Sequence, residues 1–360
     1  MDNVESLLEE LTNAHGPSGF EGPVRAIMQR ELSGLCDGLD TDGIGSLIGR
    51  LGEDGGSPRV MLAAHMDEVG LMVKLITKEG YVMFLPLGGW LDQALINQRW
   101  VIMTRNGPVL GVTGVKTPHV MTAEARGQLF KREQMFIDVG ASSKEDAEER
   151  LAIRPGDPIA PDSRFTQLNG GALYLGKAWD DRVGLAVIVE VMRRLRESPP
   201  PNTLYGVATV QEEVGLRGAH TSSFAVEPDL GINLESGVAS DYPGISQEEA
   251  QEKVGSGPAI FLHDSSMLPS LKLRDLFVDT ARENDIPVQF DVLSGYGEDG
   301  AEMQRTHKGA PSINIAVPTR YLHSHNGIIS REDFDRTVDL VEAVIRKLDA
   351  DTVRELKSFD

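Results

Sequence analysis

The spacing of apolar residues predicts that the chain opens with two amphipathic helices. Apolar positions recur at helical intervals over 3–14 and again over 22–34. The segment between them, GPSGFEGP, contains glycine and proline residues that end the first helix and reverse the chain. The run RVMLAAHMDEVGLMVKLI, which begins at Arg59, is continuously apolar and follows the turn-rich GEDGGSP. This run predicts a strand that is buried on both faces.

The pattern changes twice further along the chain. From about 68 to 160, short strand-like pieces such as GYVMFLPLGG, RWVIMT and GPVLGVTG are separated by glycine and proline, which is typical of a small β-barrel. From 172 onwards strands and helices alternate, as in ALYLGKAW before DDRVGLAVIVEVMRRLRES, and a final helix is predicted over 331–348. The order of these elements predicts an α/β layered fold with a β-rich segment inserted early.

The length of the chain supports this division into parts. A chain of 360 residues exceeds what one small hydrophobic core uses, so we expect two domains. Residues 1–67 and 162–360 are predicted to form one discontinuous α/β domain, and residues 68–161 are predicted to form the inserted β-rich domain. The chain has no internal repeat, so the two domains are not duplicates.

The composition of the chain limits which binding partners and which cellular location are expected. The 40% hydrophobic and 25% charged residues are typical of a folded globular protein. The net charge of −20 repels phosphate backbones and anionic lipids, so neither nucleic acid nor a membrane is expected as a partner. The N-terminus is acidic and amphipathic, and no apolar run approaches the roughly 20 residues that span a bilayer. A cytoplasmic location is therefore expected.

Acidic and histidine side chains occur where predicted strands end. His65 and Asp67 are two residues apart, which places them on the same face of a strand, where a carboxylate can orient a metal-ligating imidazole. The simpler alternative is a histidine–aspartate pair that only stabilises the strand end. Asp180 and Asp181 immediately precede an apolar helix, and taken alone they are better explained as helix-capping residues.

Three further segments repeat this arrangement. Glu212 and Glu213 follow the strand LYGVATV, and adjacent carboxylates at a strand end repel each other unless cations or protons compensate them. Glu235 ends DLGINLE, and His323 lies in SINIAVPTRYLHSH. The carboxyl ends of strands in an open α/β sheet line one crevice, so these side chains can converge. Two histidines and several carboxylates without a thiolate indicate a catalytic metal site suited to zinc, cobalt or manganese.

The motifs HMDEVG, KAWDDRVG, TVQEEVGLRGA, SDYPG and PTRYLHSH closely resemble those of the co-catalytic metallo-aminopeptidases that assemble into tetrahedral (TET-type) particles. This family includes glutamyl and deblocking aminopeptidases, and some similar sequences are described as glucanases. The resemblance spans nearly the whole chain, with the motifs in the family's order. It implies a zinc-peptidase-like three-layer domain with a central mixed sheet, an inserted barrel-like oligomerisation domain, and a homo-oligomer, expected to be a dodecamer built from dimers.

The resemblance also implies a ligand set of five residues and two divalent metal ions per subunit. His65 and Glu235 would hold one ion, Glu213 and His323 would hold the other, and Asp180 would bridge them. Zinc and cobalt are the expected ions, and manganese is a third candidate. The substrates implied are peptides with a free N-terminus.

Two more acidic residues receive roles from the same resemblance. Asp67 would support His65. Glu212 would remain free of metal and act as the general base, taking a proton from the attacking water and passing it to the leaving amine. The resemblance further implies a cis peptide bond between Asp180 and Asp181.

The sequence departs from the family pattern in two places. Many relatives have aspartate where this chain has Glu235, and a glutamate can ligate from the same position with one additional methylene. The stretch SGYGEDGAEMQ at 294–304 replaces a loop that in many relatives is closer to Gly-Thr-Asp-Ala-Gly. Glu298, Asp299 and Glu302 make this stretch acidic, which would favour substrates with a basic N-terminal residue, but a solvated loop explains the charges equally well.

Three functions remain open at this point. Removal of N-terminal residues from peptides is the leading hypothesis. A related two-metal amidohydrolase that acts on acyl-amino acids or peptide C-termini is the first alternative, because the same ion pair serves any amide carbonyl. A non-catalytic metal-binding assembly module is the second. The sequence does not decide the N-terminal residue preference, or whether His119 reaches a neighbouring subunit or only fixes a turn.

Overall fold

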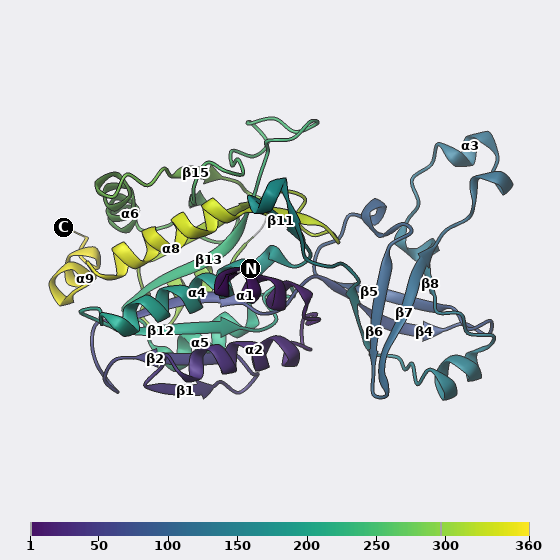
Figure 1. The fold of residues 1–360 in the computed structure, drawn as a ribbon, viewed down its shortest axis with the longest axis horizontal. Coiled ribbons are helices and arrows are strands. Elements are labelled where there is room, and N and C mark those ends of the chain that lie inside the picture. Colours follow the sequence, from purple (N-terminus) through teal and green to yellow (C-terminus); the bar gives the residue numbers. More distant parts are fainter. Residues whose placement is uncertain (1, 296, 360) are drawn as a thin grey trace.

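The computed structural model describes residues 2–295 and 297–359, which fold into a large α/β part with a smaller β-barrel at one end (Figure 1). The α/β part contains a mixed eight-stranded sheet with the order β1-β2-β12-β3-β13-β16-β14-β15. Its strands are β1 (Gly38–Thr41), β2 (Leu47–Leu51), β3 (Arg59–His65), β12 (Thr203–Thr209), β13 (Leu230–Val238), β14 (Ala259–His263), β15 (Gln289–Val292) and β16 (Ser312–Thr319).

The four central strands of this sheet run parallel, so the residues at their carboxyl ends lie at the same edge of the sheet. β3 pairs in parallel with β12 on one side and with β13 on the other, and β13 pairs in parallel with β16. The registers place His65 opposite Thr209 and Glu235 opposite Ala316. The carboxyl ends of these strands therefore meet at one edge of the sheet, as expected for an open α/β fold.

Helices cover both faces of the sheet and explain why its strands are apolar throughout. Successive residues of β3 point to opposite faces: Leu62 packs in the larger core with residues of α4, and Met61 packs in a smaller cluster with residues of α5 and α7. The helices are α1 (Asn3–Asn13), α2 (Gly22–Ser33), α3 (Ala123–Arg126), α4 (Trp179–Glu197), α5 (Arg217–Val226), α6 (Leu271–Glu283), α7 (Gly300–Arg305), α8 (Arg331–Ile345) and α9 (Ala350–Leu356). The predicted three-layer α/β architecture is confirmed.

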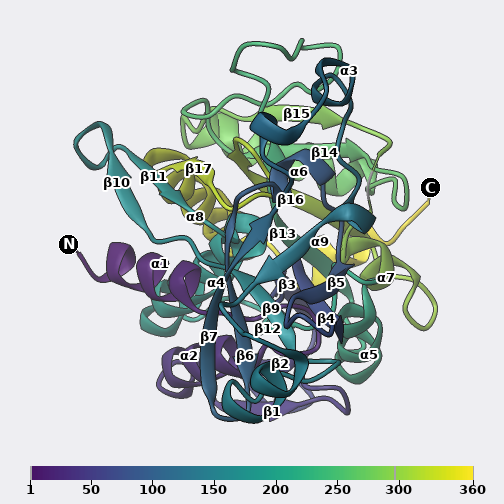
Figure 2. The same cartoon turned by 90° about the vertical axis from the view of Figure 1, so that its right-hand side faces the viewer.

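The predicted barrel is also confirmed. Six strands close in the order β4-β5-β8-β7-β6-β9 around a core that includes Trp100, Ile137 and Ile159. Figure 2 looks from this end and shows the barrel strands in front of the α/β part. The strands are β4 (Gly70–Ile76), β5 (Val82–Leu87), β6 (Arg99–Thr104), β7 (Gly107–Gly114), β8 (Phe136–Asp138) and β9 (Pro158–Pro161). The assignment of 68–161 as a separate domain stays a prediction.

One predicted strand is divided in the structure. The apolar run that begins at Arg59 forms β3, which ends at His65 in the sheet, and β4, which begins at Gly70 in the barrel. Between them Glu68 bridges to Pro17, so the chain leaves the sheet there. Gly70 permits a close approach, because a Cβ atom at this position would lie 2.8 Å from the carbonyl oxygen of Ile159. Hydrophobicity alone does not reveal this change of partner.

A third, small sheet lies beside α8. It has the order β10-β11-β17, with β10 (Thr166–Leu168), β11 (Leu173–Gly176) and β17 (Gly327–Ser330), and all pairs are antiparallel. β11 leads directly into α4, whose first turn carries the adjacent aspartates. Among the described helices, none combines the length and the apolar composition that crossing a bilayer requires.

A buried ionic cluster joins the elements around this first turn. The Lys177 ammonium lies 2.7 Å from both carboxylate oxygens of Glu68, and Arg182 donates to the carbonyl oxygen of Leu11. Gly16 donates its backbone N–H to the same Glu68 carboxylate. The cluster therefore ties α1 and its following loop to the end of β3 and to the start of α4. Buried pairs of this kind fix geometry more reliably than they add stability.

A buried pair of acids under β13 leads to a pH prediction. Glu252 is fully buried beside Gly237, where a Cβ atom would lie 1.9 Å from its carboxylate. Burial raises the pKa of Glu252 well above its ordinary value, and the neighbouring carboxyl groups of Asp291 and Asp333 raise it further. Burial also raises the pKa of Asp291. The folded protein therefore holds a proton on this pair that the unfolded chain releases.

Replacing Glu252 with glutamine is expected to increase stability more at high pH than at low pH. The folded-state pKa of Glu252 lies above its value of 4.5 in the unfolded chain, so the wild type loses stability as the pH rises above that value, by at most about 1.4 kcal/mol per pH unit for one proton. Glutamine has no proton to release. Denaturant unfolding of E252Q and wild type at pH 5, 7 and 9 measures this difference, with the exposed Glu332→Gln as control. A constant difference across the pH range would contradict the prediction.

Candidate active site

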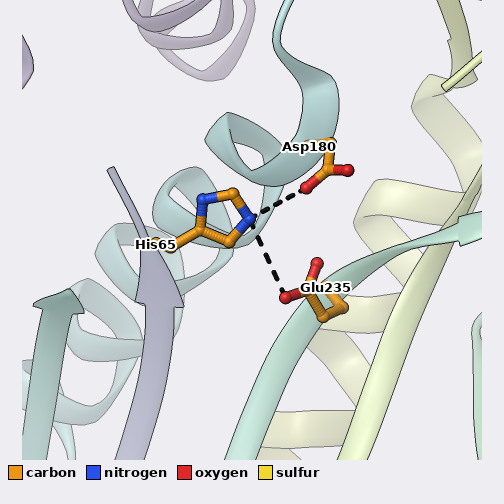
Figure 3. Close-up of side chains that lie close together, drawn as sticks. All are labelled: His65, Asp180 and Glu235. Carbon is orange, nitrogen blue, oxygen red and sulfur yellow. Dashed lines mark hydrogen bonds and ion pairs between the residues drawn. The ribbon is translucent and has the colours of Figure 1, made fainter. Parts of the chain in front are cut away.

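Three side chains from separate elements meet at the carboxyl edge of the sheet (Figure 3). His65 is the last residue of β3 and is buried. Its Nε2 atom lies 2.8 Å from Oδ1 of Asp180 in the first turn of α4, and 3.9 Å from Oε1 of Glu235. Glu235 lies within β13 rather than at its end, because the strand continues to Val238. The ligand-type atoms of these three residues all lie within 4.8 Å of one another.

A second group of three shares Asp180 with the first. The other oxygen of Asp180, Oδ2, lies 3.2 Å from Nε2 of His323, and this nitrogen lies 3.4 Å from Oε1 of Glu213. Glu213 lies beyond the end of β12, and His323 lies in the loop after β16. The two oxygens of Asp180 thus face one histidine each. The structure brings together all five predicted ligands, and their binding of metal stays a prediction.

The electrostatics of the two groups fit divalent cations. Burial, together with the charges of neighbouring acids, raises the pKa of Glu235 well above its ordinary value and that of Glu213 to about 8. Burial opposes a charge on His323, but Glu213 and Asp180 raise its pKa to about 9. Oε1 of Glu213 is buried without a hydrogen-bond partner among the described residues. Oxygen and nitrogen donors with this unbalanced negative charge suit zinc, cobalt or manganese.

Glu212 lies next to the five predicted ligands but belongs to neither group of three. Its Oε2 atom is 3.9 Å from Nε2 of His65, and its side chain lines a cavity of about 620 Å³ that opens beside the two groups. Burial raises the pKa of Glu212 well above its ordinary value, and the neighbouring acids Asp299 and Glu213 add to the effect. A carboxylate in this position can exchange a proton with a molecule in the cavity.

Asp67 supports the site in a different way from the one expected. Nδ1 of His65 contacts the backbone carbonyl oxygen of Asp67 at 3.0 Å, whereas the nearest oxygen of the Asp67 carboxylate is 3.6 Å away. The carboxylate instead accepts hydrogen bonds from Ser18 Oγ at 2.6 Å, from the Glu212 N–H at 2.9 Å and from the Glu213 N–H at 3.2 Å. Asp67 therefore positions the backbone of the glutamate pair as well as the histidine.

Two contacts that support the site, from Ser18 to Asp67 and from Asp181 to His65, were not predicted. Ser18 comes from the GPSGFE turn between the first two helices, where glycine and proline were read only as helix breakers. Asp181 accepts a hydrogen bond from the N–H of Gly184, as a helix cap does, and another from the backbone N–H of His65 at 3.2 Å. The peptide bond between Asp180 and Asp181 is cis, as the resemblance implied. No periodicity signals these contacts, because they join segments distant in sequence.

The loop that carries His323 is attached to the barrel part. His325 is buried, packs edge-on against Trp100 with ring centroids 4.5 Å apart, and hydrogen-bonds through Nε2 to the carbonyl oxygen of Arg99. His325 therefore has a structural role in holding this loop. His119 is exposed in a short turn near α3, on the segment that projects from the barrel (Figure 1).

The comparisons with known proteins agree with one another. The model of the M42 glutamyl aminopeptidase family matches residues 45–340. A TET aminopeptidase from a marine sediment archaeon of the Thaumarchaeota is 40% identical, with a TM-score of 0.96 over 99% of this chain and 100% of the other. The lysyl aminopeptidase of Pyrococcus furiosus is 34% identical, over 95% of this chain and 96% of the relative.

A third similarity concerns a protein whose assembly has been described. The TET1 peptidase of Pyrococcus horikoshii, which can assemble into a tetrahedron or a large octahedral shell, is 31% identical, with a TM-score of 0.87 over 96% of this chain and 100% of the other. The family model covers most of the chain, and both similar structures share its two-part architecture. The chain belongs to the M42 glutamyl aminopeptidase family.

Proposed function

We propose that the protein is an aminopeptidase that uses two divalent metal ions and one general base. His65 and Glu235 would hold one ion, Glu213 and His323 would hold the other, and Asp180 would contact both. The observation that carries this assignment is the position of Asp180, whose two carboxylate oxygens each face a different histidine at 2.8 and 3.2 Å. Zinc and cobalt are the expected ions, and manganese is a third candidate.

When bound, two such ions polarise the substrate carbonyl group and make a water molecule a stronger nucleophile. Glu212 lines the same cavity and belongs to neither group of ligands, so its carboxylate is available for protons. We assign it to accept a proton from the attacking water at a carboxylate oxygen and to deliver that proton to the nitrogen of the leaving amine. Asp67 accepts hydrogen bonds from the backbone N–H groups of Glu212 and Glu213 and so fixes the backbone at both residues. With this backbone fixed, the Glu213 side chain would bind metal and the Glu212 side chain would transfer the proton.

The acidic surroundings favour a substrate with a free amino terminus. Carboxylates dominate the polar lining of the cavity, and no lysine or arginine is present among its described lining residues. A positive ammonium group is attracted into such a cavity, and a free carboxylate is repelled. The repulsion of a carboxylate argues against cleavage at peptide C-termini and against acyl-amino acids as substrates, because both kinds of substrate have a carboxylate close to the scissile bond.

A panel of matched peptides tests the proposed activity. The metal-loaded protein is expected to cleave the unmodified peptide and the C-terminally amidated peptide, since both have a free amino terminus. It is expected to leave the N-acetylated peptide intact, because acetylation removes the ammonium group. Cleavage would be followed by chromatography with zinc, cobalt and manganese in turn. Preferential hydrolysis of the acetylated form would support the amidohydrolase alternative. Absence of turnover with all three metals would support a non-catalytic assembly module.

We also propose that the protein is a homo-oligomer and, more finely, a dodecamer built from dimers. The similarity to a peptidase with a tetrahedral assembly supports this. So do apolar side chains exposed on the barrel strands, among them Leu85 and Leu110, since exposed apolar residues on one part often mark an interface. A mass in solution equal to the chain mass of 39.2 kDa would contradict the proposal. A cytoplasmic location stays a prediction from the sequence.

A further inference from the structure

One acidic side chain in the cavity wall has no task in the proposed mechanism. Glu298 follows β15 in the acidic stretch 294–304, lines the same cavity as Glu212 and is only 3% exposed. Its Oε2 atom is buried without a hydrogen-bond partner, and the part of the chain that the structure describes offers it no salt bridge to lysine or arginine. The solvated-loop explanation is therefore wrong for this residue.

Two acids near Glu298, Asp264 and Asp299, each have at least one oxygen that accepts a hydrogen bond, although Oδ1 of Asp299 is, like Oε2 of Glu298, buried without a partner among the described residues. Asp264 accepts hydrogen bonds from the N–H of Met267 and from the side-chain amide of Asn314. Asp299 accepts from the hydroxyl group of Thr209. An unpaired buried carboxylate costs free energy, so the position of Glu298 is unfavourable in the protein alone.

The charge of the metal centre does not remove this cost. The four carboxylates of the centre, Asp180, Glu212, Glu213 and Glu235, carry four negative charges, which two divalent ions balance. Glu298 adds a further carboxyl group to the wall of the same cavity. No lysine or arginine occurs among the described lining residues. Glu298 therefore either retains a proton, as burial beside Asp264 and Glu212 favours, or pairs with a cation from outside the chain.

The shape of the cavity indicates which part of a substrate supplies that cation. The proposed function already places the free amino terminus in this acidic cavity, near the metal centre that would act on the scissile carbonyl. The side chain of the N-terminal residue remains, and Leu216, Val238 and Leu322 provide apolar contacts in the same cavity. A long methylene stem with a terminal charge suits such a lining, because the stem packs against apolar groups and the charge reaches a carboxylate.

We propose that Glu298 is a specificity-determining residue that selects peptides whose N-terminal residue is lysine or arginine. Its carboxylate accepts a charge-assisted hydrogen bond from the ammonium or guanidinium group, while the apolar wall contacts the methylene stem. The proposal rests on the proposed aminopeptidase function, and it identifies the substrate class of that same site.

Lysine and norleucine give a sharp test, because their side chains have four-carbon stems and differ in the terminal charge. The metal-loaded wild type is expected to cleave a lysyl peptide at least about tenfold better in kcat/KM than the norleucyl peptide. In Glu298→Gln, kcat/KM for the lysyl peptide is expected to fall by about 10- to 100-fold, the effect of losing one charge-assisted hydrogen bond. The value for the norleucyl peptide should change by less than about threefold.

Glu302→Gln is the matched control on the neighbouring helix α7. Glu302 pairs with His220 and Arg305 and does not line the cavity. Its replacement should leave the ratio of lysyl to norleucyl cleavage unchanged. Equal cleavage of the two peptides by the wild type, or an unchanged ratio in E298Q, would overturn the specificity proposal and leave the aminopeptidase function intact.

A binding measurement keeps the proposal testable without turnover. Calorimetry on the metal-loaded wild type and E298Q would compare free L-lysine with L-norleucine, which are products and are not cleaved. The wild type is expected to bind lysine at least about tenfold more tightly, and E298Q should lose this difference. Equal affinities in the wild type would overturn the specificity proposal. Failure of the aminopeptidase function would appear separately, as absence of cleavage of every peptide with a free N-terminus.

Discussion

Replacement of Glu212 by glutamine is expected to lower kcat by about 10²- to 10⁴-fold, the usual contribution of a general acid–base group. Glutamine keeps the size of the side chain and cannot accept the proton from the attacking water. The residue belongs to neither group of metal ligands, and its N–H would still donate to Asp67. The metal content of E212Q, measured by atomic spectroscopy, should therefore equal that of the wild type.

The neighbouring Glu213→Gln is the matched control for this variant. It makes the same chemical change one residue further along, but in a side chain that faces His323 and Asp180. This variant should lose metal content as well as activity, with the larger loss at the ion that His323 would hold. If E212Q lost metal, or kept its turnover, Glu212 would not be an unligated base. The two variants together separate proton transfer from metal binding.

Removal of the metal ions by a chelator is expected to abolish peptide cleavage and to destabilise the fold. Without cations, the carboxylates of Glu213 and Glu235 each repel that of Asp180 across distances shorter than 5 Å. An ion bound only by the folded state adds about 2.7 kcal/mol of stability when its free concentration is 100 times the dissociation constant. Thermal unfolding of the chelated protein should therefore begin at a lower temperature.

Readdition of each metal provides the corresponding check. Zinc, cobalt or manganese should restore both the melting temperature and the turnover, and the restored amount should depend on metal concentration. The variant Asp180→Asn should respond weakly, since it removes the carboxylate common to both groups of ligands. Unchanged activity and melting temperature in excess chelator would exclude a metal mechanism for this site.

The sequence predicted the architecture well because hydrophobic periodicity reports burial. The continuous apolar run at β3 predicted burial on both faces, and Leu62 and Met61 do pack on opposite sides of the sheet. The short strands between 68 and 160 predicted the barrel. The division of this run into two strands was missed, because Gly70 and its neighbours are as apolar as the strand before them, although the predicted boundary between residues 67 and 68 lies between the two strands.

Those residues of the candidate site whose chemical type is unusual at a strand end could be predicted from the sequence. Paired acids such as Glu212 and Glu213 are poor choices for stability, so they were visible without the fold. The partners of Asp67 were not predictable, since Ser18 and the glutamate N–H groups reach it only after folding. The burial of Glu298 was likewise hidden, because an acidic, glycine-rich stretch has the composition of a surface loop whether or not it is covered.

The attachment of the His323 loop to the barrel has a consequence for modularity. His325 lies two residues after His323, a proposed metal ligand. It packs against Trp100 and hydrogen-bonds to the carbonyl oxygen of Arg99, and both of these residues belong to the barrel. The inserted segment thus contributes Gly89 to the wall of the cavity and also holds the loop that carries His323. Shortening or exchanging the insertion would remove this support from a proposed ligand, so we expect the two parts to tolerate recombination only as a unit.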